Sequence, residues 1–186
     1  NNSCILHYNQ NDRQMEDGDL VLVDAGCEHQ GYASDITRTF PVNGKFSPEQ
    51  KAIYEIVLEA HKNCIEMLKP GVSWMQVHKK SIETITSGLI DIDLLKGSLE
   101  ENIELEKYSK FYMHKVGHWL GLDVHDVGGY GSEGNWRLME QGMVTTIEPG
   151  IYIKEGLEDV PEKFHKIGIR IEDDVLIENG GHQVLS

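Results

Sequence analysis

Two aspartates occupy positions where the surrounding residues favour β-strands. Asp24 ends the apolar run LVLVDAG at residues 20–26, and Asp35 lies in GYASDITRTF at residues 31–40. Alternating polar and β-branched residues of this kind are typical of a half-buried strand. A carboxylate that leaves water without a partner costs on the order of several kcal/mol. We therefore expect a cation to face both strands.

The second half of the chain repeats this arrangement. The aligned segments are EDGDLVLVDAG (16–26) with EQGMVTTIEPG (140–150), and GYASD (31–35) with GIRIE (168–172). Asp24 thereby matches Glu148, and Asp35 matches Glu172. Glycine and acidic residues are common, so chance could produce such a match, but all four acids and several glycines agree. We interpret the pattern as a pseudo-twofold duplication in which four carboxylates meet near the axis.

Four carboxylates held close together repel one another, and the usual outcomes are raised pKa values or bound metal. Two divalent ions would offset the four negative charges and leave room for a bridging hydroxide. Oxygen-rich ligation favours ions such as Mn²⁺, Mg²⁺ or Co²⁺ over metals that prefer thiolates. One imidazole ligand would shift the preference towards transition metals.

Three histidines could supply that imidazole: His114, His118 and His125, in FYMHKVGHWLGLDVHDVGGY at residues 111–130. A helical HxxxH zinc site is one interpretation. However, Lys115 stands where such a site has a glutamate base, and Gly117 and Gly121 disfavour a helix. Any single histidine could also be an ordinary surface or core residue. Three of them beside four acids favour a role in chemistry.

Strands and helices must position these residues. We expect β-structure near residues 19–24, 32–40, 143–153 and 168–177. The sequence predicts a helix that begins after Ser47 and reaches Leu68, because Ser47, Pro48 and Gln50 form a capping box with proline in the first turn. Ser73 and Gln76 repeat the box and predict a second helix towards Leu89. Residues 91–110 are rich in Glu and Lys, which indicates a solvated connection with some helix.

The composition limits the possible partners. The net charge of −14 argues against nucleic acid and anionic membrane, since both require a basic surface. The hydrophobic content of 39% over 186 residues is enough for one globular domain. Cys4, Cys27 and Cys64 have no CxxC spacing, so we expect reduced thiols and a cytoplasmic location.

Four stretches together resemble the metallopeptidases of the pita-bread fold: VDAGCEHQGYASDITRTF, HKVGHWLGLDVHDVGGY, TIEPGIYI and GIRIEDD. Within that group they are most similar to the Xaa-Pro aminopeptidase (aminopeptidase P) branch. The resemblance implies an α+β fold of the creatinase/aminopeptidase type, with two pseudo-twofold αββ halves and a curved antiparallel sheet. The Val-His-Asp at residues 124–126 stands where methionyl aminopeptidases typically have Phe-His-Glu.

The resemblance also implies roles for individual residues. The implied ligands of two divalent metal ions, with Mn²⁺ preferred, are Asp24, Asp35, His118, Glu148 and Glu172. Asp35 and Glu172 would bridge both ions, and a hydroxide between the ions would be the nucleophile. Glu148 would shuttle the proton, and His125 would stabilise the oxyanion. His7, His114 and His125 would bind the substrate, and Arg170 would hold the bridging carboxylates in place. The implied catalytic residues are Glu148, His125, His114 and Arg170.

The implied function is removal of the N-terminal residue from peptides with proline in the second position. Prolidase, which cleaves Xaa-Pro dipeptides and shares the stretch VHDVGGY, is the main alternative. A non-catalytic pita-bread module that binds peptides is another. The resemblance also suggests a homo-oligomeric parent protein. Residues 1–186 would be a catalytic domain that lacks its upstream part and the preceding N-terminal domain, because the first hairpin begins so near the start.

Overall fold

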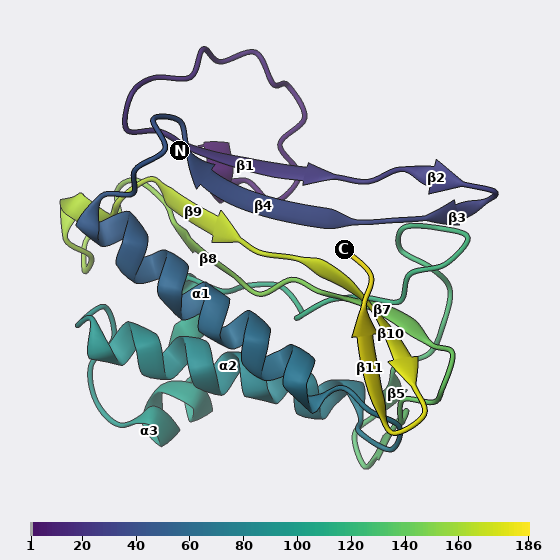
Figure 1. The fold of residues 1–186 in the computed structure, drawn as a ribbon. Coiled ribbons are helices and arrows are strands. Elements are labelled where there is room, and N and C mark those ends of the chain that lie inside the picture. The colour runs from purple at the N-terminus through teal and green to yellow at the C-terminus, as the bar shows by residue number, and fades with distance from the viewer. Residues whose placement is uncertain (1) are drawn as a thin grey trace.

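Two long antiparallel helices pack along one side of a set of short antiparallel ladders (Figure 1). The structure is a computed structural model and describes residues 2–186. The helices are α1 (Pro48–Met67), α2 (Trp74–Asp91) and α3 (Leu99–Glu104). Short 3-10 helices span Asn2–Cys4, Lys107–Lys110 and Glu162–Phe164.

The strands are short and irregularly spaced. They are β1 (Leu20–Ala25), β2 (Glu28–His29), β3 (Tyr32–Ala33), β4 (Ile36–Pro41), β5 (Gly131–Ser132), β6 (Asn135–Trp136), β7 (Val144–Ile147), β8 (Gly150–Ile153), β9 (Ile167–Arg170), β10 (Asp173–Glu178) and β11 (Gly181–Val184). All ladders are antiparallel: β1 with β4, β2 with β3, β5 with β6, β8 with β9, and β10 with both β7 and β11. Each half of the chain therefore contains the hairpin that the repeat predicts.

Both capping boxes form as the sequence predicts. The Ser47 hydroxyl accepts from the Gln50 amide at 3.1 Å, and the Gln50 side chain accepts from the Ser47 amide at 2.9 Å. The same reciprocal pair joins Ser73 and Gln76 at the start of α2. These bonds satisfy backbone donors that a helix start leaves free, so they define where the two helices begin.

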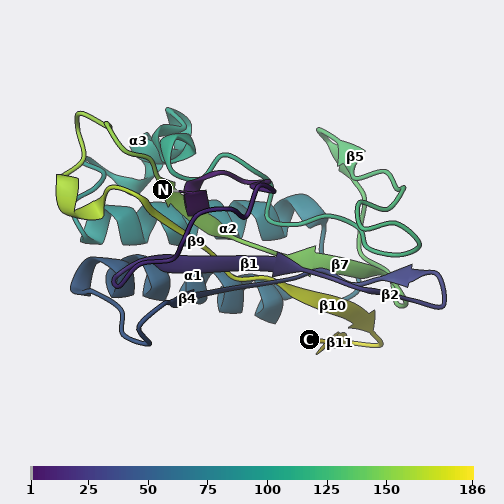
Figure 2. The same ribbon diagram turned by 90° about the horizontal axis from the view of Figure 1, so that it is seen from above.

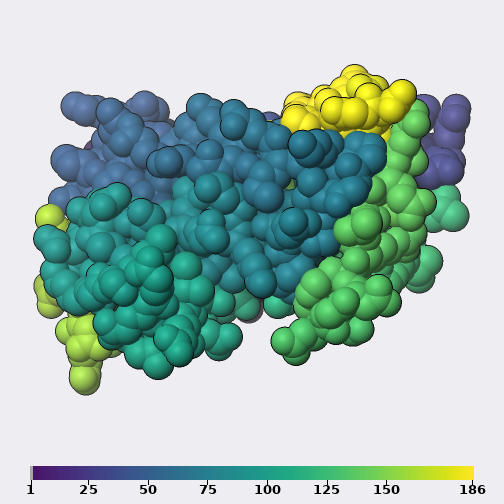
Figure 3. Space-filling view, turned by 90° about the horizontal axis from the view of Figure 1, so that it is seen from below, coloured from purple at the N-terminus to yellow at the C-terminus, as the bar shows by residue number. Residues whose placement is uncertain are grey.

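The two helices cover one face of the strands (Figure 2). A continuous core joins α1 and α2 to β8 and β9, and its fully buried members include Ile53, Val57, Ile85, Ile151 and Ile169. The face seen from below consists mainly of the blue and teal residues of α1, α2 and α3 (Figure 3). The helices therefore pack against one side of the strands and leave the other side available for a site.

Three of the expected strands are interrupted, and each interruption contains one of the acids. The segment 32–40 breaks before β4 at Asp35, 143–153 breaks at Glu148 and Pro149, and 168–177 breaks at Ile171 and Glu172. Only Asp24 lies inside a strand. Pro149 has no amide hydrogen for a ladder, and the amide of Asp35 is used by the Asp174 side chain at 3.1 Å. The expected β-structure is therefore present in these ranges, but it is divided at the acids.

The register continues unchanged across the break in the second half. Ile147 pairs with Asp173 on one side and Gly150 with Arg170 on the other, with two residues between them on each strand. Glu148 therefore lies opposite Glu172. Within residues 2–186, no helix combines the length and apolar character that crossing a bilayer requires.

The contact between α1 and α2 generates a stability prediction. Alanine usually stabilises a helix interior relative to glycine by about 1 kcal/mol. A Cβ at Gly88 of α2, however, would lie 2.6 Å from Cγ2 of Ile56 on α1. We expect Gly88→Ala to lower the free energy of unfolding of the full-length protein by about 1–3 kcal/mol, measured by urea denaturation.

The matched control is the same substitution in an Ile56→Ala background, where the obstructing atoms are absent. There Gly88→Ala should be neutral or stabilising by up to about 1 kcal/mol. An equal loss of stability in both backgrounds would contradict this account of the helix contact.

Candidate metal centre

Three acids and one threonine form a single row across the strands. Asp24 on β1 pairs with Thr37 on β4, and an isolated bridge joins Thr37 to Glu172. Glu172 in turn lies opposite Glu148. Residues directly opposite one another in antiparallel strands place their side chains on the same face. The row therefore brings carboxylates from both halves of the repeat to one place.

Asp35 and His118 complete the cluster from segments beside this row. His118 Nε2 lies 3.3 Å from Asp35 Oδ2 and 3.7 Å from Glu148 Oε1. One potential ligand atom from each of Asp35, His118 and Glu172 lies within 4.8 Å of the other two. The structure thus brings close together the five residues that the resemblance implied as metal ligands.

Gly117 allows His118 to approach. A Cβ on Gly117 would lie 2.0 Å from the carbonyl oxygen of Thr146 on β7, so any larger residue would push the segment away. The His118 amide donates to the Thr146 hydroxyl at 3.0 Å, and the Thr146 amide donates to the His118 carbonyl at 2.9 Å. The described segment around His118 is not helical, which agrees with the argument against an HxxxH helix.

Arg170 distributes its guanidinium over three partners. Its Nη2 donates to Asp24 Oδ2 at 2.5 Å, its Nη1 to the Tyr152 hydroxyl at 3.0 Å, and its Nε to the Thr37 hydroxyl at 3.2 Å. The residue is only 3% exposed. Its Nε also lies 3.9 Å from Glu148 Oε2. Arg170 therefore contacts the acidic row at several points, although its closest carboxylate is Asp24 rather than Asp35 or Glu172.

His114 is held as a neutral ring of one tautomer. The Lys115 carbonyl only accepts hydrogen bonds, so the neutral ring carries its hydrogen on Nδ1, and Nε2 accepts from the Tyr152 hydroxyl 2.9 Å away, which itself accepts from Arg170. His114 Nδ1 donates this hydrogen to the Lys115 carbonyl at 2.7 Å. Burial lowers the pKa of His114 to about 4. Both ring nitrogens are thus engaged within the protein.

His125 and His7 lie at the edge of the cluster. The His125 ring stands edge-on to the His118 ring, with centroids 4.5 Å apart. The His7 ring is 6.5 Å from that of His125. A cavity of about 1260 Å³ runs beside β1 and includes His7, Asp24 and Arg170 in its lining. Of the histidines assigned to substrate by resemblance, His7 therefore lies in the same open space as Asp24.

The charges in the cluster are poorly balanced. Burial and repulsion from Glu148 and Asp35 raise the pKa of Glu172 to about 9. Burial likewise raises the pKa of Glu148 to about 7, although His118 and Arg170 oppose the shift. Burial also raises the pKa of Asp24 against the pull of Arg170. The pKa values of these carboxyl groups rise because few described cations lie beside them.

His118 partly compensates for that imbalance. Burial lowers its pKa, but the hydrogen bond to Asp35, the carbonyl of Trp119 and the charge of Glu148 outweigh burial and raise it to about 9. The same contact reverses the effect of burial on Asp35, whose pKa lies below its usual value. Four carboxylates thus face two cationic side chains, Arg170 and His118. This donor set of carboxylate oxygens and one imidazole suits divalent cations that accept mixed oxygen and nitrogen ligands.

Several residues of the site were missing from the sequence-based prediction. Thr37, Tyr152 and Asp174 all contact candidate site residues, and all are buried. Burial raises the pKa of Asp174 to about 6. Asp174 could have been suspected from the acidic triplet at residues 172–174. Thr37 and Tyr152 give no such signal, because threonine and tyrosine are ordinary strand residues.

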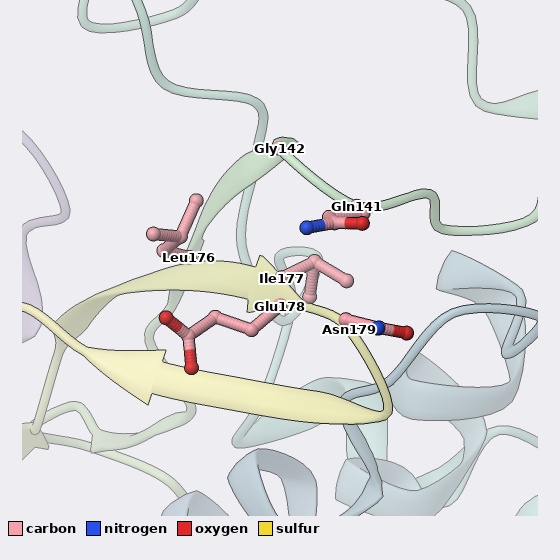
Figure 4. A pocket seen from close by; sticks show the side chains of 6 residues that line it. All are labelled: Gln141, Gly142, Leu176, Ile177, Glu178 and Asn179. Carbon is pink, nitrogen blue, oxygen red and sulfur yellow. The ribbon is translucent and has the colours of Figure 1, made fainter.

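A second, shallow hollow of about 330 Å³ lies at the end of β10 that is remote from Asp173 (Figure 4). Its lining includes Gln141, Leu176 and Glu178 and none of the candidate site residues. With a single carboxylate, it offers no comparable set of metal-binding groups.

Comparisons of the sequence and of the structure with known proteins point to the same family. The model of metallopeptidase family M24 matches residues 1–179. The chain is 57% identical to the Xaa-Pro aminopeptidase of Haemophilus influenzae and 51% identical to that of Escherichia coli, over 100% of this chain and 43% and 42% of theirs. It superimposes on Pseudomonas aeruginosa aminopeptidase PepP with a TM-score of 0.97 and 55% identity, covering 99% of this chain and 42% of that one.

These similarities confirm the α+β pita-bread fold that the sequence resemblance implied. The chain spans about two fifths of the length of the relatives that it matches.

The raised pKa of Glu172 generates a prediction for the metal-free protein. Between pH 4.5 and 9 this carboxyl group binds more protons when folded than when unfolded, so its contribution to stability falls as the pH rises. We expect Glu172→Gln to raise the unfolding temperature of the full-length protein in EDTA by about 2 °C or more at pH 8, and by less at pH 5. Differential scanning calorimetry measures both values.

Glu178→Gln, at an exposed position on β10, the strand that follows Glu172, should keep the unfolding temperature of the wild-type protein at both pH values. If Glu172→Gln destabilised the metal-free protein equally at pH 5 and pH 8, repulsion among the carboxylates would not be the source of the shift.

Proposed function

The chain belongs to metallopeptidase family M24, and from this premise we propose that the protein carrying it is a dinuclear-metal aminopeptidase. Its substrates are peptides with proline in the second position, from which it removes the N-terminal residue. Residues 1–186 form part of its catalytic domain. The observation that carries the proposal is the convergence of Asp35, His118 and Glu172, each offering a ligand atom within 4.8 Å of the others.

Five residues hold the two divalent ions in this proposal: Asp24, Asp35, His118, Glu148 and Glu172. The mixed oxygen and nitrogen donor set supports Mn²⁺ as the metal. Such ions lower the pKa of a coordinated water and polarise a peptide carbonyl. The large excess of carboxylate charge over cationic side chains at this position also supports the assignment.

Glu148 moves the proton in the proposed reaction. Its carboxylate would accept a proton from the attacking water and return it to the leaving amine. Arg170 keeps Asp24 oriented through a short ion pair. Tyr152 links Arg170 to His114 and so ties the acidic row to the histidines.

The histidines bind and orient the peptide. His125 lies beside His118 and supplies a hydrogen bond to the oxyanion that develops at the scissile carbonyl. His7 extends the same edge of the site. His114 contributes as a fixed neutral ring, because its nitrogens are bonded to the Tyr152 hydroxyl and the Lys115 carbonyl.

The specificity for proline rests on similarity to Xaa-Pro aminopeptidases over the whole chain. The acidic net charge supports peptides over nucleic acids or anionic membranes as partners. The free thiols of Cys4, Cys27 and Cys64 support a reducing, cytoplasmic location. A homo-oligomeric parent protein completes the proposal.

Hydrolysis of an Xaa-Pro-Yaa tripeptide by the full-length protein with Mn²⁺ tests the proposed activity. Asp35→Asn should reduce kcat/KM by more than about 100-fold, because loss of residues that merely support metal ligands already costs 10–100-fold. Asp159→Asn, at an exposed aspartate that lies 3.6 Å from Lys110, should retain wild-type activity. Wild-type activity in Asp35→Asn, or no hydrolysis by the wild-type protein, would reject the proposal.

The same assay with an Xaa-Pro dipeptide separates the proposed enzyme from prolidase. We expect the tripeptide to be cleaved with a kcat/KM at least about tenfold higher, a difference of about 1.4 kcal/mol in transition-state stabilisation. Cleavage of the dipeptide alone would assign the protein as a prolidase. Metal binding without hydrolysis of either peptide would indicate a non-catalytic module.

A further inference from the structure

Thr37 is the only uncharged residue of the row that contains Asp24, Glu172 and Glu148. It lies on the inner face of β4, where alternate residues are buried, and its side chain is fully buried. Its neighbours in the row are Asp24 on one side and Glu172 on the other. A threonine at this position therefore lies between carboxylates from the two halves of the repeat.

The hydrogen bonds of the Thr37 hydroxyl are fully determined. Arg170 Nε donates to Thr37 Oγ1 at 3.2 Å. The hydroxyl has one hydrogen, and its other close polar neighbour is Glu172 Oε2 at 2.6 Å. Because arginine cannot accept, the hydroxyl hydrogen must be donated to Glu172. A hydrogen bond from a neutral donor to a carboxylate at this distance is short and strong.

The backbone reinforces this contact. The Glu172 amide donates to the Thr37 carbonyl at 3.1 Å, and Arg38 Nη1 donates to the carbonyls of both Thr37 and Glu172, at 3.0 Å and 2.6 Å. Asp173 in turn accepts from Arg38 Nη2 at 2.6 Å. The main chains of Thr37 and Glu172 are thus held together, which leaves the Thr37 hydroxyl to determine the orientation of the Glu172 carboxyl group.

We propose that Thr37 is a positioning residue, whose hydroxyl orients the Glu172 carboxylate for binding divalent metal. This inference rests on the proposed function at one point, because it takes Glu172 to be a metal ligand. It assigns Thr37 no contact with the substrate and no part in proton transfer. Its consequence is that metal affinity depends on the hydroxyl group rather than on the volume of the side chain.

Thr39 provides a matched control on the same strand. It is also buried, and it lies on the same face two residues further along β4. Its hydroxyl accepts from the Arg170 amide at 3.2 Å and donates to the Arg170 carbonyl at 2.9 Å. Thr39 therefore joins β4 to β9 through the same kind of hydroxyl but contacts no carboxylate of the row.

Isothermal titration of the metal-free full-length protein with Mn²⁺ alone tests the proposal. Thr37→Val, which replaces the hydroxyl by a methyl group of similar size, should weaken Mn²⁺ binding by about 10–100-fold. Thr37→Ser and Thr39→Val should each stay within about threefold of the wild-type affinity. The unfolding temperature of each metal-free variant is measured alongside, so that loss of folded protein is separated from loss of affinity.

Should Thr37→Val not fold, Thr37→Ala and Thr37→Ser form a second pair that differs only in the hydroxyl, and the serine variant should bind Mn²⁺ about tenfold more tightly. Wild-type affinity in Thr37→Val, or equal weakening in Thr39→Val, would overturn the proposal. No Mn²⁺ binding by the wild-type protein would overturn the proposed function as well, which distinguishes the two failures.

Discussion

Electrostatic repulsion among clustered carboxylates is the constraint on which the rest of this site depends. Asp24, Asp35, Glu148 and Glu172 converge where the described cationic side chains are Arg170 and His118. The pKa of Glu172 near 9 and of Glu148 near 7 show how costly the charged forms are without further positive charge. A fold that keeps such a cluster must compensate for it, and divalent cations do so with the ligands present.

The packing of the helices and the register of the strands together bring the four carboxylates into one cluster. The helices α1 and α2 bury one face of the strands, so the strands can break at Asp35, Glu148 and Glu172 without loss of the core. Continuous register across the break in the second half places Glu148 opposite Glu172. The bridge between Thr37 and Glu172 then joins the two halves of the repeat. The duplication therefore has a direct physical result, because each half contributes acids to one shared row.

The sequence predicted those parts of the structure that depend on local patterns. Both capping boxes mark the starts of the long helices, and the internal repeat identified the four acids. The breaks in the strands could not be predicted, because the amides of Asp35 and Glu172 donate to the Asp174 side chain and the Thr37 carbonyl, which lie more than 130 positions away. Thr37 was missed for the same reason. Its hydroxyl gains significance only from the register between β4 and the segment after β9.

The position of bound metal in the full-length protein tests the central claim most directly. Anomalous diffraction from crystals grown with Mn²⁺ locates the ions without reference to activity. The account predicts two anomalous peaks, both surrounded by the carboxylates of Asp24, Asp35, Glu148 and Glu172, with His118 Nε2 as the imidazole ligand. Peaks located elsewhere, or no peak among these carboxylates at saturating Mn²⁺, would contradict it.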